Sequence, residues 1–423
     1  MSIDSIDYRY HAVGQGLFAS GALVERGPMR ARFRWVYDCG TVSGNQLVID
    51  GINDMASLND SRQRLDLVTI SHFDKDHISG LAELLGHFPV DTLMLPYATL
   101  AARLALAFAQ GVTSSDPVFR LFADPVGYIR ALDGGRRIGR ILFVPPSDGE
   151  AVPPPPDAPE EMPGIDGEEG DFELRLDTEA LGDTEAPELM IDGDADQSPR
   201  AELLRRGGRL RVEGLWEFVP YNNADLLPPD LEDFARAVGI LREELLAAAA
   251  AWRAGQGTPG SVHTAVATLK LCYDARFGSD AVARNLISLF LYAGPLPGLR
   301  LHDGNSLVAY QPGNHRHWDH PRRVAQLFSG DGYLDSRERL DALVRHFSEV
   351  RIDRVGIFQV MHHGAGRNWH KGVAGRLAPL ISVFSSDPER GNTYHPKADV
   401  LRDFWSYGPT QVDLRSSLHV EVG

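Results

Sequence analysis

The chain of 423 residues has few cysteines, no long apolar run and no excess of positive charge. Two cysteines, Cys39 and Cys272, are too few for a disulfide-built secreted domain and fit a reduced cytosol. The first ten residues, MSIDSIDYRY, lack the basic and apolar regions of a signal peptide. No apolar run approaches the ~18 residues that a membrane-spanning helix needs. We therefore expect a cytoplasmic protein without a membrane partner.

The negative charge is concentrated in one segment. The formal net charge is −16, and residues 151–200 hold sixteen Asp and Glu against two Arg, a net of −14 that leaves −2 for the rest. The stretch from Pro145 to Asp171 is rich in Pro, Gly and acidic residues and nearly free of large apolar residues, so it cannot bury enough surface to offset its ordering entropy. We expect residues 146–205 to be a disordered acidic insertion. The net charge therefore does not argue against a nucleic-acid substrate.

The remaining chain alternates strand-like and helix-like pieces. Residues 1–145 and 283–423 each combine short apolar runs, such as LDLVTIS and RVGIFQV, with helical patterns. Residues 206–282 are mostly helical in pattern, and PDLEDFARAVGILREELL carries its acids early, as a helix N-terminus favours. These patterns predict one α/β domain in two halves, 1–145 and 283–423, separated by the acidic insertion and a helical insertion over 206–282.

A cluster of metal-ligand types follows the apolar run that begins at Leu67, in the stretch LVTISHFDKDHISGL. A strand followed by a tight loop can aim alternate side chains at one point. His72 and Asp74 are two residues apart and can reach one ion, whereas Asp76 and His77 can reach a second. Imidazole with carboxylate suits Zn, Mn or Fe. The alternative is a polar turn in which an Asp caps the next helix.

Four further features favour the metal centre over the polar turn. Each places a ligand-type residue where an apolar, strand-like run ends. They are Asp38 in YDCG, Asp331 in LFSGDG, His362 and His363 in VMHHGAG, and His395 in GNTYHP.

As a set, these motifs resemble the metallo-β-lactamase superfamily and, within it, the soluble metallo-hydrolase domain of ComEC-type competence proteins. The resemblance rests on Val13–Gly16, Asp38–Gly40, Ser71–Gly80, Asn285–Ser288, Gly330–Asp331, His362–Gly364 and Asn392–Pro396. It implies an αββα sandwich and two divalent ions, Zn or Mn. The chain departs from the family in three places: Asp74 stands where most members have His, a third-motif His has no clear counterpart, and Tyr394 joins His395 without an intervening Gly.

The resemblance also implies roles for single residues. Asp76 would bind metal and orient the attacking water, Asp331 would bridge the two ions, and one of His362 and His363 would be a ligand while the other faces the substrate. Asp38 would hold a ligand by hydrogen bonding. His395 would bind the second ion or donate a proton to the leaving oxygen.

The substrate hypothesis is a phosphodiester, and a nuclease is the leading interpretation. Basic residues near the motifs would then contact the substrate: Arg367 and Lys371 after the His-His pair, and Arg316, Arg322 and Arg323 before Asp331. One alternative is a hydrolase of small esters, lactones or cyclic nucleotides. Another is a partner-binding module with a vestigial metal site. Soluble ComEC-type relatives also resemble effectors of bacterial defence systems, in which residues 146–282 would bind a protein partner.

Overall fold

The computed structural model describes residues 3–423 except 26–29, 58–62, 114–115, 117, 148, 155–173, 182–188, 190–198, 213, 224–230, 242–259, 278–286, 298, 300, 302–305, 320–321 and 391–394. Most of the acidic stretch lies outside the described residues, so the expectation of disorder there stays a prediction. Asn285, Asn392 and Tyr394 of the quoted motifs also lie outside them.

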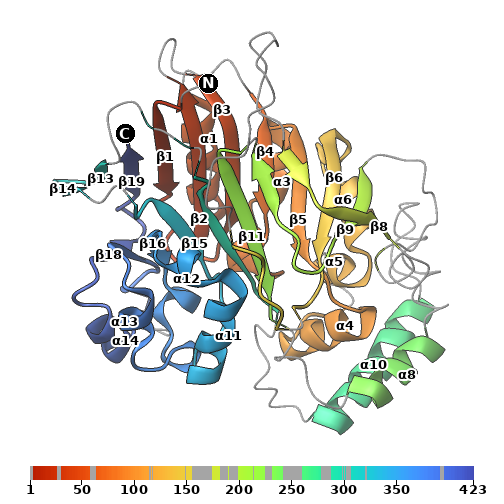
Figure 1. Ribbon diagram of the computed structural model, residues 1–423. Coiled ribbons are helices and arrows are strands. Elements are labelled where there is room, and N and C mark those ends of the chain that lie inside the picture. Colours follow the sequence, from red (N-terminus) through yellow and green to blue (C-terminus); the bar gives the residue numbers. More distant parts are fainter. Residues whose placement is uncertain are drawn as a thin grey trace.

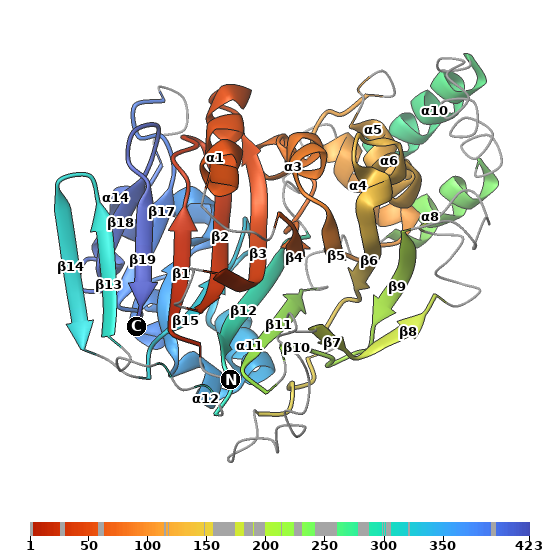
Figure 2. The same cartoon turned by 90° about the horizontal axis from the view of Figure 1, so that it is seen from above.

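Two twisted sheets form the centre of the molecule (Figures 1 and 2). The larger sheet has, in spatial order, β14 (Asn314–Asp319), β13 (Ser306–Gln311), β19 (Leu418–Val422), β1 (Ser5–Tyr10), β2 (Gly16–Glu25), β3 (Arg30–Thr41), β4 (Leu65–Thr69), β5 (Val90–Pro96), β6 (Ile138–Val144), β9 (Arg200–Leu204) and β8 (Thr178–Ala180). The smaller sheet has β18 (Pro409–Val412), β17 (Ile381–Ser385), β16 (Val355–Gln359), β15 (Ala325–Phe328), β12 (Leu289–Pro295), β11 (Trp216–Asn222), β10 (Leu210–Val212) and β7 (Leu174–Leu176).

Helices cover the outer faces of both sheets. Against the larger sheet lie α1 (Asn45–Ser57), α2 (Lys75–Ile78), α3 (Leu81–His87), α4 (Leu100–Ala109), α5 (Phe119–Ala123), α6 (Pro125–Ala131) and the short η1 (Gly135–Arg137). The smaller sheet is covered by α11 (Arg337–Phe347), α12 (Glu349–Ile352), α13 (Val373–Leu377) and α14 (Ala398–Asp403), with the turns η3 (Met361–Gly364) and η4 (Gly366–Asn368) near its strand ends.

Three apolar cores separate these layers. The core between the sheets contains Trp35, Trp216 and Phe328, and the two outer cores seat the helices on each sheet. The central strands β4 and β16 are buried along their whole length, which explains why their sequences are continuous apolar runs instead of alternating ones. The αββα arrangement predicted from the sequence is confirmed.

The stretch between the two halves takes part in the sandwich. Strand β9 pairs with β6 in the larger sheet, and β11 pairs with β12 in the smaller one. Strands β7, β8 and β9 lie within 146–205, so these parts of the acidic stretch are ordered, contrary to the expectation for the whole of it. Helices α8 (Leu231–Ile240) and α10 (Gly260–Phe277) agree with the helical pattern of 206–282 and lie together beside α4 (Figure 1). The domain boundaries themselves stay a prediction.

The strand directions bring the motifs to one edge of the sandwich. Strands β3 to β6 run parallel, as do β15 to β17, and the predicted ligands follow the carboxyl ends of β4, β15, β16 and β17. Arg322 and Arg323 precede β15 and therefore lie at the opposite edge of the sandwich from the motifs. Arg316 belongs to β14, the outermost strand of the larger sheet, where its guanidinium donates to Thr410 Oγ1. The expectation that these three arginines line the metal centre is therefore wrong. No helix among the described residues is long and apolar enough to cross a membrane.

Candidate metal centre

The loop after β4 presents the first motif residues. Backbone amides of His77 and Ile78 bond to Asp74 O, so the chain enters the single turn of α2 immediately after Asp74. The short helix packs closely on β3. A Cβ atom on Gly40 would lie 2.5 Å from the backbone of His77, so only glycine permits this approach. The loop thereby turns His72 and His77 toward the second sheet.

The buried carboxylate of Asp331 is the geometric centre of the site. Its Oδ2 lies 3.6 Å from His72 Nε2 and 3.5 Å from His362 Nε2. Its Oδ1 lies 3.1 Å from His77 Nε2 and 3.8 Å from His363 Nε2. The four imidazoles therefore form two pairs, one on each oxygen of the same carboxylate.

Each of these histidines is held through its other ring nitrogen. His77 Nδ1 donates to Asp38 Oδ2 at 2.7 Å, and His363 Nδ1 donates to the carbonyl of Ser385 at 2.5 Å. His362 Nδ1 donates to Asn368 Oδ1 at 3.0 Å. Ser71 Oγ donates to Asp38 and so can accept from His72 Nδ1, 2.8 Å away. With all four protons on Nδ1, every Nε2 presents a lone pair to the centre, as metal-bound imidazoles require.

The two aspartates of the first motif lie differently. Asp76 Oδ2 is 3.2 Å from His363 Nε2, on the side of Asp331 Oδ1. Asp74 lies at the edge of the cluster: its Oδ2 is 3.9 Å from His72 Nε2, and its Oδ1 accepts a hydrogen bond from Gln110. The structure therefore brings Asp76 into the centre and Asp74 beside it.

Three residues of the site have a left-handed backbone conformation that is rare for residues other than glycine. The φ angles are 54° for Asp38, 44° for His362 and 57° for His363. Such left-handed conformations cost free energy and persist where the surrounding structure enforces them, which is common at functional sites. Here the surrounding hydrogen bonds of the Asp38 and histidine side chains provide that constraint.

The electrostatics of the metal-free centre match a place for cations. Burial alone would raise the pKa of Asp331, but His362, His77 and His363 hold it well below its usual range. Burial alone would lower the pKa of His77, but Asp331 and Asp38 hold it well above its usual range. His72 has no such surplus of carboxylates, and burial together with His77 lowers its pKa to about 3. Positive charge is therefore stabilised on the Oδ1 side of Asp331.

The predicted substrate residues are placed unequally. The His395 ring centroid lies 5.9 Å from that of His362, and burial, His363, His362 and Lys397 lower the pKa of His395 to about 4. Arg367 is exposed on η4, directly before Asn368. For Lys371, by contrast, no interaction with the centre is found in the part of the chain that the structure describes.

The sequence interpretation assigns no role to three residues of the site. Asn368 is buried and joins three parts of the centre: its Oδ1 accepts from His362, and its Nδ2 donates to the carbonyls of Asp331, at 2.8 Å, and Gly332. Ser71 links Asp38 to His72, and Gln110 reaches Asp74 from the end of α4. Ser71 is the first residue of the quoted motif Ser71–Gly80, Asn368 only follows the His-His pair closely, and Gln110 has no signal in the sequence.

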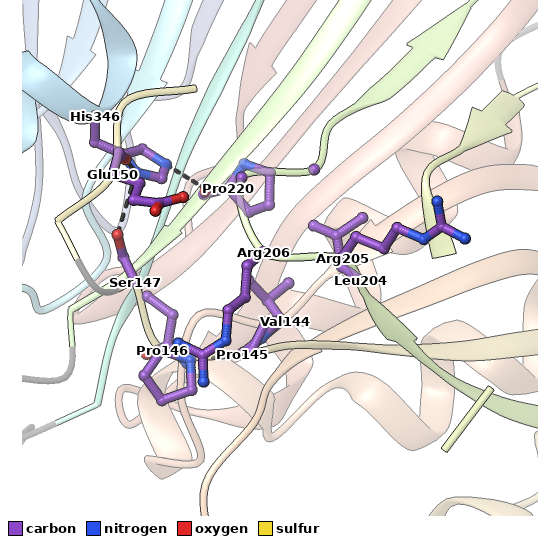
Figure 3. Close-up of a pocket in the computed structure, with 13 residues that line it drawn as sticks. Val144, Pro145, Pro146, Ser147, Glu150, Leu204, Arg205, Arg206, Pro220 and His346 are labelled. Carbon is purple, nitrogen blue, oxygen red and sulfur yellow. Dashed lines mark hydrogen bonds between the residues drawn. The ribbon is translucent and has the colours of Figure 1, made fainter. Parts of the chain in front are cut away.

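Two clefts lie at this edge of the sandwich. The first lies next to the centre and is mainly apolar, lined by His72, Phe73, Asp74, Pro96, Ala98, Leu106, Gln110, Phe122 and Ile287. The second lies where β6, β9 and β11 end (Figure 3). In it, His346 Nε2 donates to Pro220 O, and His346 Nδ1 lies 3.3 Å from Ser147 Oγ. His346 therefore fastens the chain after β6 and has no other ligand-type imidazole beside it in this lining.

The comparison with known families agrees with this geometry. Residues 33–185 match the metallo-beta-lactamase superfamily. This match covers Asp38 and the motif from His72 to His77, and it ends before Asp331. Together with the two-sheet sandwich, it establishes the metallo-β-lactamase fold and implies a metal-dependent hydrolase. The chain matches none of the curated proteins searched.

The donor set fits the divalent ions that this superfamily implies. Among the described residues, two groups could each hold an ion, because the donor atoms within each group all lie within 4.8 Å of one another. They are His72, His77 and Asp331, and Asp76, His77 and His363. The Nε2 atom of His72 is buried and has no hydrogen-bond partner among the described residues. Leaving such an atom unsatisfied in a protein interior is costly, and a cation bound to it would remove this cost.

Proposed function

We propose that this protein is a metal-dependent phosphodiesterase of the nuclease class that uses two divalent ions, Zn or Mn. The observation that carries the proposal is the pairing of four imidazole Nε2 atoms on the two oxygens of Asp331. A carboxylate shared in this way is what two adjacent cations need.

The geometry suggests how the residues divide between the ions. One imidazole nitrogen has one lone pair, so His77 can serve only one of the two donor groups that contain it. His77, His363 and Asp76 would hold one ion together with Asp331, and His72, His362 and Asp74 would hold the other together with the same carboxylate. His362 would then supply the imidazole that the missing third-motif histidine gives in other members. Both residues of the His-His pair would be ligands.

Other roles in the reaction would fall to side chains of the protein. Divalent ions at these positions lower the pKa of a water ligand and offset the charge that develops on the phosphoryl oxygens. Asp76, beside His363, would orient the attacking water. Neutral His395, beside His362, could accept or donate a proton near the leaving oxygen. Arg367 and Lys397 would provide positive charge for an anionic substrate.

A second candidate is a hydrolase of small esters or lactones. It is favoured by the mainly apolar cleft beside the centre, because His72 and Asp74 line both the cleft and the metal site. Such a cleft would take a small apolar group. An effector role in a bacterial defence system, with a protein partner bound through residues 146–282, stays a prediction.

One experiment separates these functions. The purified chain is stripped of metal, reloaded with Mn or with Zn, and incubated with supercoiled plasmid, single-stranded DNA, RNA and 4-nitrophenyl acetate. We expect nucleic-acid cleavage that Asp76→Ala abolishes while the fold is kept. Glu83→Ala, on the exposed face of α3, is the matched control and should cleave normally. Cleavage of the ester alone would support the second candidate and refute the first.

A further inference from the structure

Beside the metal centre, an aromatic side chain lies among positive charges. Tyr333 is two residues beyond Asp331 and is partly exposed. The guanidinium of Arg339 lies over its ring, 5.8 Å from the ring centroid, and Asp335 pairs with that guanidinium. Arg367 is exposed on η4, directly before Asn368, whose backbone carbonyl accepts a hydrogen bond from the amide of Leu334, the residue after Tyr333.

Backbone contacts hold this group against the centre. The segment from Gly332 to Leu334 runs beside the segment from Arg367 to His370: Leu334 N donates to Asn368 O at 2.8 Å, and His370 N donates to Leu334 O at 3.0 Å. Asn368, in the second of these segments, also donates to Gly332 O and accepts from the imidazole of His362. The positions of Tyr333 and Arg367 are therefore tied to the metal ligands.

An aromatic ring with adjacent guanidinium groups has a definite preference for ligands. The ring offers a stacking surface for a planar group, and the exposed guanidinium of Arg367 attracts phosphate. A ligand that satisfies both is planar at one end and anionic at the other, as a nucleotide unit is. A small aliphatic ester would use neither feature.

We infer that Tyr333 and Arg367 form a subsite for the nucleotide that flanks the scissile phosphodiester, with the base on the Tyr333 ring and a neighbouring phosphate at Arg367. The inference rests on the proposed phosphodiesterase function and specifies its substrate. The ligand is one nucleotide unit, whether it comes from a nucleic-acid strand or from a small dinucleotide.

The test uses binding as well as cleavage. Fluorescence anisotropy of the metal-free protein is measured with a labelled oligonucleotide and with a strand of the same length built from abasic units. The wild-type protein should bind the base-bearing strand about tenfold more tightly, since stacking of one base contributes on this scale. Tyr333→Ala should reduce this preference to about twofold or less, and Tyr333→Phe should keep it. Tyr310→Ala, an exposed tyrosine on the distant β13, is the matched control and should keep it too.

Charge reversal tests the phosphate contact separately. Arg367→Glu should weaken binding of both strands alike and reduce the slope of log affinity against log salt by about one. Arg322→Glu, at the opposite edge of the sandwich, should change neither. An unlabelled dinucleotide that competes as well as a longer strand would identify the small molecule as the source of the ligand.

The outcomes distinguish the two proposals. A base preference that survives in Tyr333→Ala, or that is absent from the wild-type protein, overturns the subsite. Loss of the preference in Tyr333→Ala, in a protein that cleaves no phosphodiester with Mn or Zn, supports the subsite and refutes the phosphodiesterase function. Thermal melts of each variant exclude unfolding as the cause.

Discussion

Replacing Asp38 by asparagine should weaken metal binding while the protein still folds. Asp38 is completely buried and accepts three hydrogen bonds: from Ser71 N at 2.6 Å, from Ser71 Oγ at 2.7 Å and from His77 Nδ1 at 2.7 Å. Asparagine has the same shape and tolerates the left-handed φ of 54° better than most residues. Its amide group, however, donates where the carboxylate accepts.

The consequence for His77 follows from the tautomer. With an amide NH₂ facing Nδ1, the imidazole places its own proton on Nε2, the atom that lies 3.1 Å from Asp331 Oδ1. Metal binding must then reverse that tautomer. The lost charge-assisted hydrogen bond contributes about 1.5–3 kcal/mol, and outer-shell changes of this kind reduce metal affinity about 10- to 100-fold. The two scales agree, because tenfold corresponds to about 1.4 kcal/mol.

Chelator competition with Zn and with Mn measures the affinity, and urea unfolding measures the stability. Asp66→Asn is the matched control. Asp66 lies on β4, next to the strand that carries Asp38, is also buried, and accepts a hydrogen bond from the backbone amide of Arg34 at 2.7 Å. It should lower stability and leave metal affinity unchanged. An Asp38→Asn protein whose metal affinity stays within about twofold of wild type would refute the assigned tautomer.

Three further predictions concern ligands, protons and stability. The double variant His72→Ala/His77→Ala should lose most of its bound metal in elemental analysis while its circular dichroism stays native; unchanged metal content would refute the ligand assignment. The pKa of His77 is raised in the metal-free protein, so its contribution to stability is complete below about pH 6.5 and is lost as pH rises through the raised pKa. A bound metal ion must displace this proton, so the apparent metal affinity should rise with pH. Calorimetry of metal binding in two buffers should detect the released proton. Arg351 forms a fully buried bidentate pair with Glu217, at 2.8 and 3.0 Å. Arg351→Met should lower the free energy of unfolding by about 3 kcal/mol, because the buried carboxylate then keeps only Arg209, 3.1 Å from its Oε2. A loss of under about 1 kcal/mol in urea unfolding would show that Arg209 alone compensates the carboxylate.

Much of the fold was predictable because its signals are local. The apolar runs that became β4 and β16 are buried along their whole length, and a central strand of a covered sheet needs that composition. The motif residues from His72 to His77 and the His-His pair could be identified because ligand types cluster after such runs. The partial match of residues 33–185 to one superfamily follows from the same local pattern.

Spacing along the chain could not indicate how these residues meet. Only the parallel order of β15, β16 and β17 opposite β4 places Asp331 between two pairs of imidazoles, and only side-chain geometry puts Asp74 against Gln110 at the edge. Arg322 and Arg323 are near Asp331 in sequence, but a strand carries them to the opposite edge of the sandwich. Asn368 could not be identified from the sequence either, because its role depends on hydrogen bonds that join Asp331 to His362 across two loops. The sequence by itself thus determined the layers of the sandwich and the types of side chain at the strand ends. The pairing of the two sheets decided which of those side chains share a site, because contacts between distant residues leave no trace in the local pattern of the sequence.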